Sequence, residues 1–152
     1  ILVHLYEDLG VHCLHELRGE FAFVLWDERT QQLFAARDRF GIKPLFYAQL
    51  GDTLTFASEA KALFAAGVPA RWDHDSVFQE FHFVHDVGRS VFEGVHQVLP
   101  GHFLLATHAG VRSQRYWDVD FPLRDAPLPR RSDEDYIEEV REALLGSGTA
   151  TA

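Results

Sequence analysis

The chain has 152 residues, 47% of them hydrophobic and 24% charged, which is enough for one globular domain with a buried core and excludes a disordered or fibrous protein. Its 14 Lys and Arg stand against 23 Asp and Glu, and the formal net charge of -9 argues against nucleic acid or an anionic membrane as a partner. The single cysteine, Cys13, excludes an internal disulfide, and no apolar run approaches the ~18 residues of a membrane span, so we expect a cytoplasmic protein.

Apolar spacing predicts two helical segments and then a hairpin in the first quarter of the chain. Gly10 and Gly19 mark the ends of the helical segments. The apolar run that begins at Phe21 is typical of a strand buried on both faces, and a polar turn separates it from the next strand. The expected elements are helices over 1–9 and 11–17 and strands over 21–26 and 31–37.

The middle of the chain continues as strands and short helices. Pro44 has no backbone N–H and is expected at the start or edge of a strand. Ser58 is the expected N-cap of one helix, and Asp75 or Ser76 is the expected N-cap of another. The expected elements are strands over 41–48, 53–57, 91–98, 101–107 and 111–117 and helices over 58–64 and 77–83.

The composition changes after Trp117. Residues 121–131 contain three prolines and several charges, which is typical of a linker. Ser132 and Asp135 have the spacing of a capping box at the start of a helix that Gly146 ends. Because a lone helix of about 14 residues is marginal in water, we expect its apolar stripe to need a partner domain. The stripe consists of Tyr136, Ile137, Val140 and Leu144.

The nine histidines raise the hypothesis of a metal site. On a helix His82 and His85 would share a face, and with Asp86 they could bind zinc. The segment 12–15 forms the other close group, but neither group has a second pair at zinc-site spacing, so ordinary core or surface histidines are favoured. Cys13 is either a nucleophile activated by a neighbouring histidine or a small buried apolar side chain, and the second interpretation is favoured.

The segment 37–45 places charges directly after a buried strand. Asp38 lies between Arg37 and Arg39, which predicts a bidentate ion pair that fixes the turn. Gly41 allows a backbone conformation that other residues resist. Two interpretations stay open at this corner: a structural clamp between strands, and the border of a ligand pocket.

Five motifs then carry a family resemblance. Residues 17–27 and 37–47 resemble the buried hairpin and the Arg-Asp-x-x-Gly-x-x-Pro-Leu signature of class II glutamine amidotransferase domains. Residues 56–63 are similar to the Phe-Ala-Ser-Glu-x-Lys-Ala-Leu motif of glutamine-hydrolysing asparagine synthases. Residues 99–102 and 115–118 match the Pro-Gly-His and Tyr-Trp-Asp motifs near the end of that domain.

The resemblance implies an α+β fold, an αββα sandwich of the N-terminal-nucleophile hydrolase type, incomplete at its N-terminus. Residues 1–120 would be the C-terminal part of the glutamine amidotransferase domain, and 121–131 the linker. Residues 132–152 would be the truncated first helix of a synthetase domain. The chain starts at Ile1 and contains no Met, so we expect a fragment of a longer protein.

The family's chemistry begins at an N-terminal cysteine, whose thiolate attacks the carboxamide of glutamine. The α-amino group of that cysteine, with an ordinary pKa near roughly 8, would act as the base. Ammonia leaves the glutamyl thioester through an internal tunnel, and water then releases glutamate. In the synthetase domain ATP and Mg²⁺ would activate aspartate as an acyl-adenylate, which the ammonia attacks.

The residues of these reaction centres are missing from the sequence. The nucleophile and the glutamine-binding segments of the family belong upstream of Ile1, and Cys13 does not match the nucleophile's position. The Ser-Gly-Gly-x-Asp-Ser loop of the synthetase domain is also absent. We therefore expect no catalytic residue, metal site or cofactor within this fragment and no activity from it alone. Arg37, Asp38 and Gly41 are the candidate supports of the glutamine pocket, and Glu20 stands where many relatives carry a methionine beside the tunnel.

The favoured function is thus that of part of an ATP-dependent asparagine synthase with glutamine and aspartate as substrates. Its partner would be the synthetase domain of the same chain, and a homodimer is compatible with the resemblance. Two alternatives remain. One is another amide-forming amidotransferase, such as an enzyme related to β-lactam synthetases. The other is a non-catalytic binding module that has lost the nucleophile.

Overall fold

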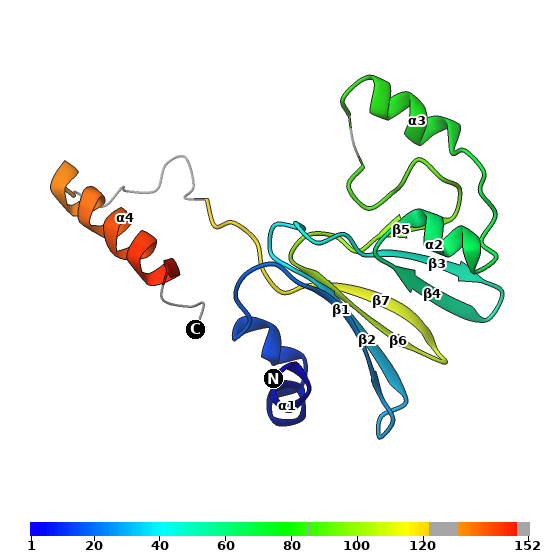
Figure 1. Ribbon diagram of the computed structural model, residues 1–152, viewed down its shortest axis with the longest axis horizontal. Coiled ribbons are helices and arrows are strands. Elements are labelled where there is room, and N and C mark those ends of the chain that lie inside the picture. Colours follow the sequence, from blue (N-terminus) through cyan, green and yellow to red (C-terminus); the bar gives the residue numbers. More distant parts are fainter. Residues whose placement is uncertain (85, 122–130, 149–152) are drawn as a thin grey trace. The chain divides into compact units, whose positions relative to one another are not determined.

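The computed structural model describes residues 1–84, 86–121 and 131–148. The chain divides into two compact units, Ile1–Val119 and Asp120–Ala152, and most of the expected linker lies outside the described residues. The elements of the first unit (Figure 1) are α1 (Leu2–Leu9), the 3-10 helix η1 (Gly10–His15), β1 (Ala22–Asp27), β2 (Gln32–Arg37), β3 (Phe46–Leu50), β4 (Thr53–Ala57), α2 (Ala60–Ala65), α3 (His74–Phe81), β5 (Val95–Gln97), β6 (His102–Thr107) and β7 (Gly110–Arg115).

Two antiparallel sheets form the centre of the first unit. The larger sheet has the strand order β1-β2-β6-β7, and the smaller has the order β4-β3-β5. In the larger sheet Phe34 of β2 lies opposite Leu25 of β1 and Leu105 of β6. Neighbours in the sheet are therefore not always neighbours in sequence, since the second sheet is inserted between β2 and β6.

Successive residues of β2 point to opposite faces of the larger sheet. Phe34 and Ala36 pack in a core with Leu14 of η1 and with side chains of α1. Ala35 points the other way and packs with Leu104 and Val98 between the two sheets. The alternation of β2 thus separates an outer core under the helices from a central core between the sheets.

A third core lies beyond the smaller sheet. Ala48 of β3 and Val95 of β5 pack against Leu63 of α2 there. With the two cores described above, the order of layers is helix, sheet, sheet, helix. The structure therefore confirms the expected α+β fold with an αββα sandwich.

The prediction that the first strand is buried on both faces is wrong. Val24 and Trp26 of β1 are 43% and 50% exposed. They lie opposite Ala35 and Leu33, whose side chains face the smaller sheet. Since β1 is an edge strand of the larger sheet, the smaller sheet leaves this part of the inner face uncovered.

Two strands and two helix caps also differ from the sequence prediction. The expected strand over 41–48 begins only at Phe46, because residues 41–45 form a loop, and the strand expected over 91–98 is the short β5. Ser58 does not cap α2, whose N-cap position is held by Glu59 without a side-chain hydrogen bond. Helix α3 is capped two or three residues earlier than expected, by Asp73, whose carboxylate accepts a hydrogen bond from the backbone N–H of Ser76 at 3.1 Å.

The second unit contains α4 (Asp133–Gly148), which extends past the predicted end at Gly146. The predicted capping box is confirmed. The backbone N–H of Ser132 donates to the carboxylate of Asp135 at 2.9 Å, and the N–H of Asp135 donates to the Ser132 hydroxyl at 3.2 Å. The apolar stripe of this helix is exposed in the second unit. Across the described parts of the chain, no helix combines the length and the apolar character that crossing a bilayer requires.

Candidate functional site

The corner that follows β2 is built on two buried charges. Arg37 is the last residue of β2, and Asp38 is the next residue. Arg37 is only 8% exposed, and Asp38 is only 1% exposed. Burying a charge is costly unless hydrogen bonds replace the lost water, so the partners of both groups determine what this corner does.

The guanidinium of Arg37 donates to four acceptors. Its Nε donates to the carbonyl of Lys43 at 2.8 Å, and its Nη2 donates to the carbonyl of Gly41 at 2.5 Å. Its Nη1 donates to the carbonyl of Val98 at 2.9 Å and to Oε1 of Gln97 at 3.3 Å. Gln97 ends β5, so a residue of the larger sheet holds the end of the smaller sheet.

The carboxylate of Asp38 accepts hydrogen bonds from the loop that follows it. The backbone N–H groups of Phe40 and Ile42 donate to Oδ1 at 3.1 and 3.0 Å, and that of Lys43 donates to Oδ2 at 2.9 Å. Burial alone would raise the pKa of Asp38, but these N–H groups outweigh it and hold the pKa below its ordinary value. The ionised carboxylate therefore fixes the shape of the loop.

The backbone around this pair joins three further segments. The N–H of Asp38 donates to the carbonyl of Phe21 at 2.8 Å, and the carbonyl of Asp38 accepts from the N–H of Gly101 at 3.0 Å. The hydroxyl of Tyr116 donates to the carbonyl of Arg37 at 2.9 Å. Burial, with a smaller effect of Asp38, raises the pKa of Tyr116 to about 12, so the phenol stays a donor at neutral pH.

The prediction of a bidentate ion pair at this corner is wrong. Among the described residues no guanidinium lies within ion-pair distance of Asp38. The two side chains have separate sets of partners, because Arg37 donates to backbone and Gln97 oxygens while Asp38 accepts from backbone N–H groups. The two side chains thus bind the same loop through different backbone groups, Arg37 through its carbonyls and Asp38 through its N–H groups.

Gly41 is required in this loop for two reasons. Its φ of +65° lies in the left-handed region that favours glycine. A Cβ atom at this position would also lie 2.8 Å from Cγ of Pro100 and 3.0 Å from Cζ of Arg37. The loop therefore has no room for a side chain where it passes the guanidinium.

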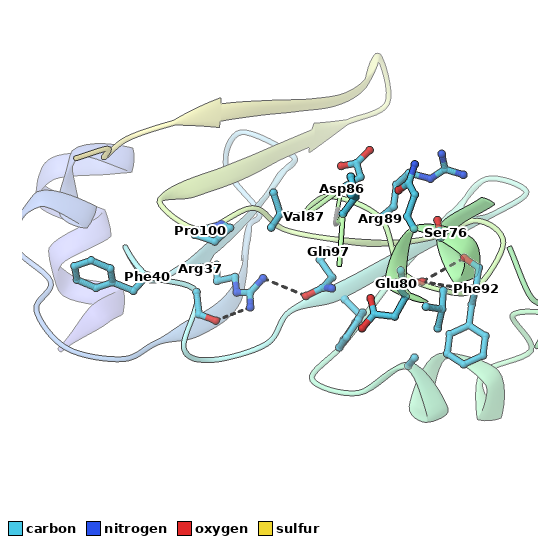
Figure 2. Close-up of a pocket in the computed structure, with 17 residues that line it drawn as sticks. Arg37, Phe40, Ser76, Glu80, Asp86, Val87, Arg89, Phe92, Gln97 and Pro100 are labelled. Atoms are coloured by element: carbon cyan, nitrogen blue, oxygen red, sulfur yellow. Dashed lines mark hydrogen bonds between the residues drawn. The ribbon is translucent and has the colours of Figure 1, made fainter. Parts of the chain in front are cut away.

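A cavity of about 730 Å³ opens beside the corner. One side of the cavity is lined by Arg37, Gly41, Gln97 and Pro100. The other side is lined by residues of α3 and of the loop that follows it (Figure 2). Arg37 and Gly41 therefore line this cavity, whereas Asp38 supports the loop behind it. That this pocket receives glutamine stays a prediction.

The structure argues against Cys13 as a nucleophile. Its side chain is fully buried among Leu14, Phe34 and Phe103. Burial raises the pKa of the Cys13 thiol, which disfavours the reactive thiolate. Cys13 is therefore a core residue.

The other candidates do not assemble into a centre in the described chain. The rings of His12 and His15 stack at 6.1 Å, and no group of three His, Cys, Asp or Glu residues within the described ranges could hold a metal ion. His85, part of the second proposed zinc group, lies outside the described residues. Glu20 is half exposed and pairs with Lys43 at 3.1 Å, so its carboxylate lies at the surface of the described chain.

Sequence reasoning missed the partners of Arg37 that come from the far end of the smaller sheet. Gln97 and Val98 follow Arg37 by about sixty residues. Only the order of strands brings them to the end of β2. The motif of residues 99–102, which begins just after them, was the one available signal that this segment meets the corner.

The sequence of the chain is similar to a family model and to several known proteins. Residues 1–117 match a family model described as a glutamine amidotransferase domain. The chain is 42% identical over 146 residues to amidase chry2 of Gibberella zeae, covering 95% of this chain and 21% of that protein. It is 37% identical over 123 residues to the glutamine-hydrolysing asparagine synthetase 3 of Bacillus subtilis, covering 79% of this chain and 20% of that protein. The chain thus spans about a fifth of the length of these relatives.

A solved structure supports the fold. The glutamine phosphoribosylpyrophosphate amidotransferase from B. subtilis matches 76% of this chain, and 22% of its own chain, with a TM-score of 0.54. The sequence identity of 23% limits this likeness to the arrangement of the backbone.

Replacing Asp38 by Asn should lower the free energy of unfolding by about 3 kcal/mol at neutral pH, because an amide cannot accept from all three N–H groups. Since the pKa of Asp38 is held below its ordinary value, the native carboxylate stabilises the fold above about pH 4, and this contribution is lost as the pH falls further. Denaturant unfolding of both proteins between about pH 3 and pH 7 measures the difference. Asp52→Asn, in the exposed turn after β3, is the control, and a D38N effect independent of pH would contradict the account.

Replacing Gly41 by Ala should destabilise the chain by about 3 kcal/mol, since the new Cβ adds an overlap with Pro100 to the backbone strain. Gly51 has a similar φ of +59° but nothing within 4 Å of its Cβ position. Gly51→Ala should therefore cost only about 1 kcal/mol, and thermal unfolding of the two variants separates strain from overlap. Equal losses of stability would show that the close approach to Pro100 has no effect.

Proposed function

The chain belongs to the class II glutamine amidotransferase domain family, and from this we propose that it is the C-terminal part of the glutaminase domain of an ATP-dependent asparagine synthase. The observation that carries the proposal is the similarity of this sandwich, along most of its sequence, to glutamine-hydrolysing asparagine synthetases. The complete protein would hydrolyse glutamine and transfer the ammonia to activated aspartate.

In the proposed reaction a cysteine thiolate attacks the carboxamide carbon of glutamine. The C–N bond breaks, the leaving nitrogen takes a proton from the α-ammonium of that cysteine, and ammonia departs. Water then cleaves the glutamyl thioester and releases glutamate. Because Cys13 is buried with a raised thiol pKa, this nucleophile would come from protein outside the 152 residues.

The uncovered inner face of β1 supports such an addition. Val24 and Trp26 are about half exposed on the face that elsewhere forms the central core. β1 also has a free edge in the described sheet, and a free edge pairs readily with another strand. We assign to Arg37, Asp38 and Gly41 the role of holding the two sheets around the pocket while the added segment supplies the chemistry.

ATP and Mg²⁺ do not fit the residues present here. The sequence contains no phosphate-binding loop, and the described part of the chain offers no cluster of three potential metal ligands. We assign both to the synthetase domain, where they would activate the acceptor. A cytoplasmic location and a homodimer stay predictions.

A second candidate has a different acceptor in the same class of reaction. The observation in its favour is that the identity to amidase chry2, 42% over 146 residues, exceeds the identity to asparagine synthetase 3 and extends further along the chain. The acceptor would then be a carboxyl group other than that of aspartate. The third alternative is a binding module without activity. It would hold only if the full-length protein does not hydrolyse glutamine.

The test supplies the full-length gene product with amide-¹⁵N-glutamine, ATP, Mg²⁺ and aspartate. We expect ¹⁵N-asparagine, glutamate and AMP in equal amounts, as mass spectrometry would measure. The Cys13→Ala variant should keep this activity within about twofold, since Cys13 is a core residue. Glutamate without labelled asparagine would favour the other acceptor, and no glutamate from a folded protein would leave only the binding module.

A further inference from the structure

An exposed apolar surface extends along α3 and the residues that follow it. Figure 1 shows α3 at the end of the first unit beyond the smaller sheet, far from α1. The surface, which we name the α3 patch, consists of Phe78 (63% exposed), Phe81 (80%), Phe83 (88%), Val84 (63%) and Val87 (61%), and the last two also line the cavity beside Arg37. Several large apolar side chains exposed on one short segment are typical of a site where another protein surface packs.

The backbone at the end of α3 gives a second, independent observation. The N–H of Val84 donates to the carbonyl of Gln79 at 3.0 Å, and the N–H of Phe83 donates to the carbonyl of Glu80 at 3.2 Å. This pair of bonds is the Schellman motif, in which the residue after the helix adopts a left-handed conformation. Phe83 holds that position with a φ of +56°.

Glycine is the usual residue at this position, because any side chain there strains the backbone. Phe83 instead combines a strained φ with the most exposed ring of the patch. Neither feature stabilises the described unit by itself. Strain that persists in a native structure is commonly connected with function, and here it holds an aromatic ring out from the surface.

The charges around the patch indicate what kind of surface would fit it. Asp75, Glu80 and Asp86 lie on the same segment, and the sequence has no Lys or Arg from residue 72 to residue 88. Asp73 is paired with Arg89 at the edge of this segment. A matching surface would therefore be apolar at its centre and carry Lys or Arg at its rim.

We propose that the α3 patch is the docking surface for the synthetase domain of the same polypeptide. This inference rests on the proposed function. The chain spans only about a fifth of its relatives, so a domain tethered to it has a high effective concentration and can cover an apolar surface without a second molecule. The domain would place its apolar surface over Phe81 and Phe83 and its basic rim against Asp75 and Asp86.

The first test is cleavage of the full-length gene product by chymotrypsin, which cuts after accessible aromatic residues. We expect slow cleavage after Phe78 and Phe81 in the native protein, because the docked domain covers them. Phe83→Gly removes the ring and the backbone strain together, and cleavage at these sites should become about tenfold faster. Phe83→Leu keeps an apolar side chain and should stay close to the native rate.

Val3→Ser is the matched control, because Val3 is a half-exposed apolar residue on α1, at the opposite outer layer of the sandwich. It should leave the cleavage rate after Phe81 unchanged. If Phe83 only ends the helix, glycine would relieve strain and cleavage would slow or stay the same, which would overturn the proposal. Protection that disappears on dilution would also overturn it, since a second copy would then be the occupant.

The second test uses the labelled glutamine assay on the same variants. Phe83→Gly should continue to form glutamate but lose about tenfold in labelled asparagine per glutamate, because ammonia escapes where the domains separate. If chymotrypsin cleaves the native protein rapidly but the protein still forms labelled asparagine, the docking proposal is refuted and the proposed function stands. A native protein that is protected from cleavage but forms no asparagine would instead refute the proposed acceptor and leave the covering of the patch established.

Discussion

The arrangement of the first unit depends on the hydrogen bonds that one buried guanidinium, that of Arg37, donates to its four acceptors. Arg37 lies at the end of β2 and is only 8% exposed, so most of its donors must be satisfied by the protein. The acceptors come from the loop after β2 and from the end of β5. Arg37 thus joins the larger sheet to the smaller one, and Asp38 holds the connecting loop in the shape that brings those carbonyls to it.

The sequence predicts this corner only in part. The charges after an apolar strand, with Gly41 close behind, indicate a fixed turn, and that interpretation is confirmed. The predicted ion pair is wrong because backbone groups, which no sequence pattern displays, are the better partners for both side chains. Gln97 could not be predicted either, since its position depends on the insertion of a whole sheet between β2 and β6.

Elements with a strong local signal were predicted well, and elements decided by their surroundings were not. The capping box at Ser132 and the hairpin strands β1 and β2 follow from spacing and turn residues. The exposure of Val24 depends on how far the smaller sheet extends, which lies outside the strand itself. Phe83 shows the same limit, because nothing in an aromatic residue predicts the left-handed conformation that glycine usually supplies.

The central claim is that Arg37 holds the two sheets together, and native-state hydrogen exchange tests it most directly. Arg37→Lys keeps the charge but cannot reach the same four acceptors. The account predicts that amides of β2 and β6 and amides of β3 and β5 lose protection together, while Arg29→Lys, at an exposed turn, changes neither sheet. Loss of protection confined to the loop over residues 40–45 would contradict the claim and reduce Arg37 to a local support of that loop.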